Sequence, residues 1–387
     1  MPESARLRNI PLQKEEPASI TVAEPVLIRP AQPADGAALI AAAAAIDAET
    51  EFLGVAGQRH PWAERPEAEL RSLAENKRGV VLLALTADGA IVGYLSAFLG
   101  HFTRNRGNLF IAVVGLREAY RGQGIGTRLF ETVEAWARER GVWRLELRVS
   151  SLNERGQALY RKRGFAVEGS IRGGVFRRGA WTDDFWMGKL IEPLPGRPLA
   201  TAGTEGARIS AGASRTAPRI RPMRAGDGAG FRALDLRFAE ILPFALKLPS
   251  EVAAAEAVER DIAANPADPR LWLVATVPGA RGGDSVVGFA AGNIEFGFRM
   301  QHDAFVNVVV LPEHAGQGLG RRLHGGIESW ALDNGARRLT AAVQAPNRAG
   351  RAFAAALGYE GEVTMRGYSL IGGRRVDRLR LGKLFGA

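Results

Sequence analysis

The chain has 387 residues, 46% of them hydrophobic, and this length favours two domains of ordinary size over a single core. Cysteine is absent, which excludes disulfides, thiolate metal ligands and a cysteine nucleophile. The net charge of +10 is scattered and lacks the interleaved aromatic residues of a single-strand nucleic-acid platform. We therefore expect a solvated surface and no nucleic-acid partner, although a phosphate-rich small molecule would account for the excess charge equally well.

Nothing in the sequence points to a membrane span or a metal site. No apolar run reaches the roughly 18 residues that cross a bilayer, and residues 1–23, expected to be a flexible tail, lack the apolar centre of a secretion signal. We expect a cytoplasmic protein. The histidines show no HExxH or paired-ligand spacing, so no metal is expected. They are His60, His101, His302, His314 and His324.

The sequence contains an internal repeat. Residues 192–217 are rich in Pro, Gly, Ala, Ser and Thr, and they predict a linker. On either side of this linker, at 24–191 and 218–387, the same order of patterns recurs. From the glycine turns onward the two copies stay 194 residues apart, as Gly124 and Gly318 illustrate. A constant separation between matching positions indicates that the two units arose by duplication.

In chain order, each unit predicts a strand, two helices, three strands, a helix, a strand, a short helix and two strands. The first unit opens with a strand, a turn and a helix at 27–46 and continues with a hairpin at 79–99. An apolar strand at 108–116 then leads into a glycine turn and an amphipathic helix. This order predicts an α/β fold, a mixed sheet with helices on both faces, built twice.

The glycine turn is the clearest motif. AYRGQGIGTRLFETVEAWARERG begins at Ala119, and HAGQGLGRRLHGGIESWALDNG begins at His314. Alternate glycines leave backbone N–H groups open to a ligand, and the following helix adds about half a positive charge at its N-terminus. The turn therefore predicts a phosphate site. A dinucleotide fingerprint would need a glycine at Thr127, and a Walker loop would need GK[ST], so both are excluded.

Arg121, Gly124 and Gly126 form the [R/Q]xxGx[G/A] turn of the GNAT superfamily of acyl-CoA N-acyltransferases. The segments NERGQALYRKRGF (153–165) and DDFWMGKL (183–190) also resemble that superfamily. The resemblance covers nearly all of both units. It implies two tandem GNAT-type α/β sandwich domains, each a mostly antiparallel sheet whose fourth and fifth strands splay in a V. It also implies acetyl-CoA as the cofactor and coenzyme A as the product.

By this resemblance the pyrophosphate of coenzyme A lies on the glycine turn, and a backbone N–H near Val113 or Val114 polarises the thioester. Asn153 is a natural N-cap of the short helix and is also implied to contact the cofactor arm. Arg121 either contacts a phosphate oxygen or stays solvated beside the turn. The implied cofactor-binding residues are Val113, Val114, Arg121, Gly122, Gln123, Gly124, Ile125, Gly126, Thr127, Asn153, Gly316, Gln317, Gly318, Leu319, Gly320, Arg321 and Asn347.

Acyl transfer needs a free amine, a stabilised oxyanion and a proton for the leaving thiolate. Tyr160 occupies the position of the general acid in many superfamily members, and a phenol with a pKa of about 10 can protonate a thiolate whose acid titrates at about 8.5. The sequence does not identify the general base. The candidates are Glu146, His101, Glu49 and Glu51, and we place Glu146 among the catalytic residues. A water chain is the alternative.

The second copy carries Ala315 in place of Arg121 and Ala354 in place of Tyr160. We expect the first unit to perform the chemistry and the second to be degenerate or regulatory. The predicted function is transfer of an acetyl group from acetyl-CoA to a primary amine of a small molecule or peptide, by a monomer or homodimer. The alternative is a non-catalytic acyl-CoA-binding or sensing module. Residues 46–74 and the terminal hairpin are expected to build the acceptor pocket.

Overall fold

The computed structural model describes residues 25–53, 65–177, 179–191, 217–242, 245, 247–263, 270–279, 283–294 and 302–385. The expected N-terminal tail, nearly all of the expected linker, and part of the expected acceptor segment lie outside these residues.

The helices and strands of the first unit follow the order predicted from the sequence. They are β1 (Leu27–Pro30), α1 (Gly36–Ala48), α2 (Pro66–Asn76), β2 (Gly79–Leu85), β3 (Ile91–Leu99), β4 (Asn108–Leu116), α3 (Ile125–Glu139), β5 (Arg144–Ser150), α4 (Glu154–Lys162), β6 (Ala166–Arg177) and β7 (Ala180–Leu190).

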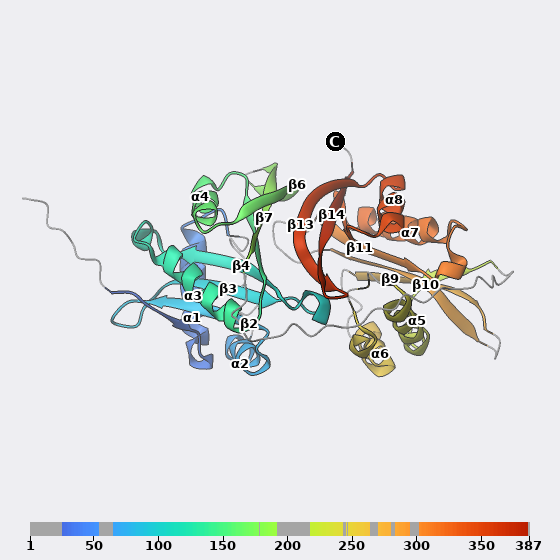
Figure 1. The fold of residues 1–387 in the computed structure, drawn as a ribbon, viewed down its shortest axis with the longest axis horizontal. Coiled ribbons are helices and arrows are strands. Elements are labelled where there is room, and N and C mark those ends of the chain that lie inside the picture. The colour runs from blue at the N-terminus through green and yellow to red at the C-terminus, as the bar shows by residue number, and fades with distance from the viewer. Residues whose placement is uncertain are drawn as a thin grey trace, which may run out of the picture.

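The second unit repeats this order (Figure 1). Its elements are β8 (Arg219–Pro222), α5 (Gly228–Ile241), α6 (Ala255–Ala263), β9 (Arg270–Pro278), β10 (Asp284–Ile294), β11 (Asp303–Val310), α7 (Leu319–Asp333), β12 (Arg338–Gln344), α8 (Arg348–Ala356), β13 (Glu360–Ile371) and β14 (Arg374–Leu384). The prediction of one α/β fold built twice is confirmed.

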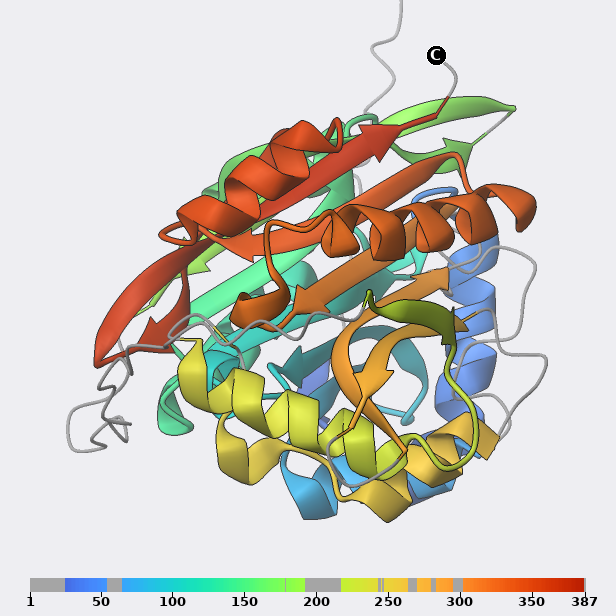
Figure 2. The same cartoon turned by 90° about the vertical axis from the view of Figure 1, so that its right-hand side faces the viewer.

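Helices cover both faces of the sheet in each unit. In the first unit, alternate residues of β2 and β3 point to opposite faces. Leu82 and Leu95 face a core that contains α3, whereas Leu83 and Tyr94 face a second core beneath α1 and α2. Figure 2 shows the same division in the second unit, with α5 and α6 in yellow tones on one side and α7 and α8 in orange and red on the other.

The two units share one 14-stranded sheet, in the order β1-β2-β3-β4-β5-β7-β6-β13-β14-β12-β11-β10-β9-β8. Strands β4 and β5, like β11 and β12, pair in parallel, and the other described pairs are antiparallel. The join between β6 and β13 is a single bridge from Gly169 to Val363. A Cβ on Gly169 would lie 1.9 Å from the carbonyl oxygen of Glu362, so this contact requires glycine.

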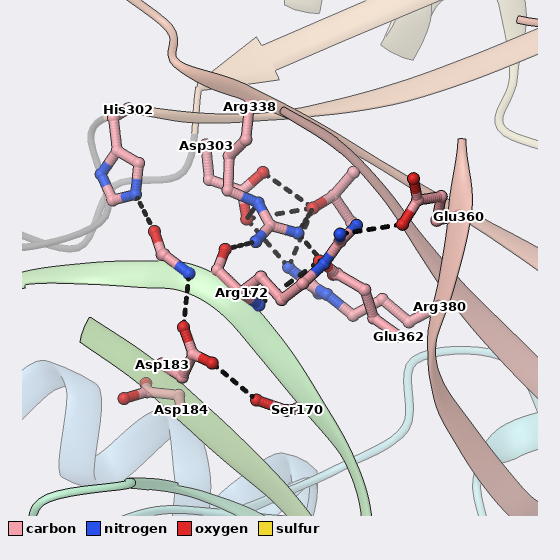
Figure 3. Close-up of polar contacts among 12 residues, drawn as sticks. Ser170, Arg172, Asp183, Asp184, His302, Asp303, Arg338, Glu360, Glu362 and Arg380 are labelled. Carbon is pink, nitrogen blue, oxygen red and sulfur yellow. Dashed lines mark hydrogen bonds and ion pairs between the residues drawn. The ribbon is translucent and has the colours of Figure 1, made fainter. Parts of the chain in front are cut away.

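Buried arginines hold the units together on either side of the join. Arg144 on β5 donates to Glu168 of its own unit at 2.9 Å and to the carbonyl of Arg366 in the second unit at 2.8 Å. Its counterpart Arg338 on β12 donates to Glu362 at 2.6 Å and to the carbonyl of Arg172 in the first unit (Figure 3). Neither arginine side chain is exposed. The interface is therefore charged, and its charges are paired.

The Arg338 cluster predicts a large effect on stability. Arg338→Ala leaves Glu362 and Asp303 buried without this partner, and breaking a buried ion pair costs about 3–5 kcal/mol. Urea unfolding should show a fall in unfolding free energy of that size. Glu139→Ala, which removes a more exposed pair with Arg140, is the control and should change little. Equal unfolding free energies for the two variants would contradict the conclusion that the Arg338 ion pairs stabilise the interface.

Candidate active site

Both glycine turns adopt the same backbone conformation. Gly122 and Gly124 have φ of 82° and 80°, and Gly316 and Gly318 have φ of 76° and 74°. These angles favour glycine because a Cβ is disfavoured in the left-handed region. Gly124 and Gly318 are the N-caps of α3 and α7, whose first N–H groups have no acceptor within the helix. Each unit therefore presents a helix N-terminus suited to an anion.

Other turn residues predicted to bind the cofactor also take part in packing or in contacts within the protein. A Cβ on Gly126 would lie 3.2 Å from Leu159 of α4, and one on Gly320 would lie 3.2 Å from Phe353 of α8. Ile125 and Leu319 are buried at the starts of their helices, whereas Gln123 and Gln317 are exposed.

Two further predicted residues follow the turns. Thr127 is half-buried, and Arg321 donates to the carbonyl of Ala356 at 3.3 Å. Their contacts with a cofactor stay predictions.

Arg121 connects the first turn to the end of α1. Its Nε donates to the carbonyl of Leu116 at 3.0 Å, and its Nη2 lies 3.4 Å from the carbonyl and 3.7 Å from the carboxylate of Glu49. The Glu49 carboxylate also accepts from Nε of Arg117 at 2.6 Å. The N–H of Glu118 and the Arg117 guanidinium lower the pKa of Glu49. Glu49 is thus an ionised anchor between α1 and the turn.

A second cation near the turn was not among the residues predicted from the sequence. Arg155, on the first turn of α4, has its Nη2 3.7 Å from where a Cβ on Gly122 would lie. The matching residue of the second unit is Ala349. An arginine present in only one copy is the signal that could have identified it.

The fourth and fifth strands separate where the superfamily resemblance implies. Strands β4 and β5 pair from Asn108 with Arg144 to Ile111 with Leu147, and their pairing ends there. Val113 and Val114 lie beyond this point. Among the described residues, the β5 side of this part of β4 has no strand partner. Its backbone groups therefore need another partner.

A β-bulge lies at the same place. On the β3 side, Ser96 pairs with Val113 and Ala97 pairs with Ile111, so Ala112 is an extra, exposed residue. A bulge re-aims the backbone and is common beside active sites. The second unit has none here, since β10 and β11 pair in continuous register. The first unit alone combines the strand separation with a bulge.

Tyr160, on α4, packs against aromatic rings from outside this helix. Its ring centroid lies 5.6 Å from that of Phe130 and 6.3 Å from that of Phe165. Burial raises the pKa of Tyr160 to about 12, so the phenol stays protonated at neutral pH and can donate a proton. In the second unit the matching position is Ala354, and His324 donates to or accepts from the Tyr359 hydroxyl at 3.0 Å.

The base candidates lie in different surroundings. Glu146 is 4% exposed, and its Oε2 accepts from Arg144 Nε at 3.1 Å and Trp186 Nε1 at 3.3 Å. Burial raises the pKa of Glu146, and Arg144 opposes that shift. His101 lies before β4 with its Nδ1 3.3 Å from Arg78 Nη2, and Glu51 accepts from Arg177 through its carbonyl. Glu146 thus lies beside the domain interface, and its catalytic role stays a prediction.

The expected cap of α4 is present, and α8 has a matching cap that was not predicted from the sequence. Asn153 caps α4 and accepts from the N–H of Gly156 at 2.9 Å, and Asn347 caps α8 and accepts from Gly350 at 2.9 Å. The N-cap prediction is confirmed, whereas contact of either residue with a cofactor arm stays a prediction.

A family model described as Acetyltransferase (GNAT) family matches residues 44–165 and 240–359, together more than half of the chain. The chain belongs to the GNAT acetyltransferase family. One match falls in each unit, which confirms the tandem arrangement expected from the sequence.

Curated relatives match shorter stretches of this GNAT chain. An uncharacterized N-acetyltransferase, YdgE, of Bacillus subtilis is 43% identical over 58 residues, 15% of this chain and 37% of that protein. Thialysine N-epsilon-acetyltransferase of Bos taurus is 31% identical over 74 residues, 19% of this chain and 44% of that protein. The matches thus span less than half the length of either relative.

The solved structures each match a stretch of the chain about as long as one of its two units. A GNAT-family acetyltransferase from Streptococcus pneumoniae matches 43% of this chain and 100% of that chain, at 31% identity and a TM-score of 0.41. YncA, a putative acetyltransferase from Salmonella typhimurium with its cofactor acetyl-CoA, matches 44% of this chain and 96% of that chain, at 18% identity and a TM-score of 0.39.

Within the described residues, none of the helices is long and apolar enough to cross a membrane. The same part of the chain holds no cluster of three or more His, Asp or Glu residues that could bind a metal ion.

The raised pKa of Tyr160 predicts that the wild type and a Tyr160→Phe variant lose stability differently at alkaline pH. Between about pH 10, where an unfolded tyrosine ionises, and about pH 12, the unfolded chain has lost this proton and the folded protein has kept it. Stability therefore falls as pH rises through this window. Tyr160→Phe removes the contribution, so denaturant titrations should show a shallower decline than in the wild type. Parallel pH curves would show that burial does not shift this phenol.

Proposed function

We propose that the first domain, residues 24–191, transfers an acetyl group from acetyl-CoA to a primary amine. The observation that carries the proposal is the coincidence of strand separation and a bulge at Ala112 in the domain that also has Tyr160. Family membership supports acetyl-CoA as the donor. Both a small molecule and a peptide fit as acceptor, and the thialysine acetyltransferase among the relatives favours a primary alkylamine.

The glycine turn and its cations would hold the donor. Backbone N–H groups at Ile125, Gly126 and Thr127 face an anion placed at the N-terminus of α3. Arg121 and Arg155 add positive charge beside it. Fixing the pyrophosphate here leaves the pantetheine arm to pair with the free edge of β4.

The thioester would react beside the bulge. A backbone N–H at Val113 or Val114 stabilises the oxyanion that forms when the amine attacks the carbonyl carbon. The carbon–sulfur bond then breaks, and the Tyr160 hydroxyl gives its proton to the thiolate. The proton that the amine nitrogen loses restores the tyrosine. No covalent enzyme intermediate is needed, in keeping with a chain that has no cysteine.

The second domain, residues 218–387, is proposed to bind acyl-CoA without fast catalysis. Gly316 and Gly318 keep the turn, and Arg321 and Arg322 follow it, which favours cofactor binding. Ala354 offers no proton donor, and β11 has no bulge. A binding or sensing role for this half is therefore the second candidate function.

Replacing Tyr160 tests the chemistry. Tyr160→Phe removes the proton donor and keeps the ring, so kcat should fall about 10²-fold to 10⁴-fold with little change in the KM for acetyl-CoA. The assay follows thiol release with a panel that includes lysine and thialysine. Unchanged turnover in this variant would assign the proton transfer to another group.

Glycine variants test the location of the cofactor. Gly124→Ala places a methyl group where the pyrophosphate would lie, so calorimetry should show affinity for acetyl-CoA at least about tenfold weaker, or about 1.4 kcal/mol. Gly141→Ala is a matched control, because Gly141 also has a positive φ, 69°, and open space around it, but it lies at the other end of α3. Gly318→Ala should leave thiol release unchanged. Equal losses in Gly124→Ala and Gly141→Ala would trace the effect to backbone strain alone.

A further inference from the structure

Two buried hydroxyls in the first domain are left unused by the proposed mechanism. Tyr94 and Ser96 on β3 are 0% exposed. Among the described residues, neither Tyr94 Oη nor Ser96 Oγ has a hydrogen-bond partner. Native proteins seldom bury polar groups in this way, and ordered water commonly satisfies those that remain. These hydroxyls therefore point to a polar path inside the domain.

Both hydroxyls lie along the strand where the proposed reaction takes place. Ser96 pairs with Val113, next to the bulge, and Tyr94 pairs with Gly115, one step nearer the glycine turn. Directly opposed residues of antiparallel strands share a face, and residues two apart on one strand also share a face. Ser96 and Tyr94 thus lie on the α1 side of the sheet, in line from the bulge.

A buried carboxyl group lies at the far end of this line. Asp47, in the last turn of α1, is 9% exposed. The Tyr94 ring lies under this turn, because a Cβ on Gly115 would contact Tyr94 at 3.3 Å and Ile46 at 2.9 Å. Burial and, next, the negative charge of Asp47 raise the pKa of Tyr94, so the two groups are close enough to interact.

The second domain shows that the fold does not require polar groups at these positions. By strand pairing, Phe289 matches Tyr94, since it pairs with Val309 as Tyr94 pairs with Gly115. In the same way Ala291 matches Ser96. In the helix, counting from Asp35 and Asp227, Ala239 matches Asp47. All three polar residues have apolar counterparts in the copy that also lacks the bulge and the tyrosine acid.

We propose that Ser96, Tyr94 and Asp47 form a proton path, completed by ordered water, that leads from the acceptor nitrogen at the β4 bulge to the surface at the end of α1. This inference rests on the proposed function. It makes Asp47 the proton acceptor and assigns the acceptor to amines that arrive as alkylammonium ions.

The path supplies the step that such an acceptor requires. An alkylammonium has no free electron pair, so one N–H bond must break before attack. That proton passes to water at Ser96, through the hydroxyl of Tyr94, and onto the Asp47 carboxylate, from which it reaches solvent. A hydroxyl relays a proton by accepting one and donating another, so neither hydroxyl needs to ionise. The electron pair left on nitrogen then attacks the thioester.

The second domain supplies the variants for the test. Tyr94→Phe, Ser96→Ala and Asp47→Ala each install the residue found at the matching position. With the alkylamine of the panel that the wild type accepts best, each should lower kcat at least about tenfold and leave the KM for acetyl-CoA unchanged. Thermal midpoints of the hydroxyl variants should change little, because neither hydroxyl has a protein partner among the described residues that its removal would leave unpaired. Added formate should restore part of the Asp47→Ala rate.

Phe289→Tyr in the second domain is the matched control, and it should keep full activity while its thermal midpoint falls. Variants that keep the wild-type kcat overturn the path, as does a loss of activity matched by a loss of stability or an Asp47→Ala variant that formate does not rescue. A wild-type protein that releases no thiol with any amine of the panel overturns the proposed function, and the path with it.

Discussion

The short pairing between β4 and β5 is the constraint on which the site depends. The two strands are parallel neighbours from Asn108 to Ile111 and then part, which exposes backbone groups of β4 in the middle of a sheet. Unpaired backbone groups of this kind are costly inside a protein, so a ligand that supplies the missing hydrogen bonds is bound favourably. The pantetheine arm of the proposed donor has amide groups suited to this role. The glycine turn follows the same strand after one short 3-10 helix, and in the proposed complex it would bind the other end of that donor.

The duplication serves as an internal comparison. Positions that shape the fold agree between the copies, as Gly124 with Gly318 and Asn153 with Asn347 do in both sequence and conformation. Positions assigned to chemistry differ, as Tyr160 and Ala354 do. Because both copies fold alike, their differences cannot be requirements of the fold. A buried polar group in the first copy whose counterpart is apolar is therefore better explained by function than by packing.

Patterns that act over a few residues made much of the fold predictable. The element order followed from apolar periodicity and glycine turns, and the helix cap at Asn153 followed from local hydrogen bonding. The bulge at Ala112 could not be predicted in this way, because it is defined by the register of a second strand. The contact between Arg121 and Glu49 could not be predicted from local patterns either, since the two residues lie 72 positions apart in the chain. The burial of Glu146 depends on Trp186 and Arg144 and on the join to the second unit, which no local pattern encodes.

The domain interface explains why a copy without the tyrosine acid would be kept. Arg144 and Glu168 match Arg338 and Glu362, and each arginine donates to a backbone carbonyl of the other unit. Glu146 on β5 and Trp186 on β7 are linked to the same arginine network. Loss of the second unit would leave Arg144 without the carbonyl of Arg366 and would expose the β6 edge of the sheet. The second unit therefore contacts the residues around the proposed first site, and selection on that role alone would preserve its interface with an alanine at position 354.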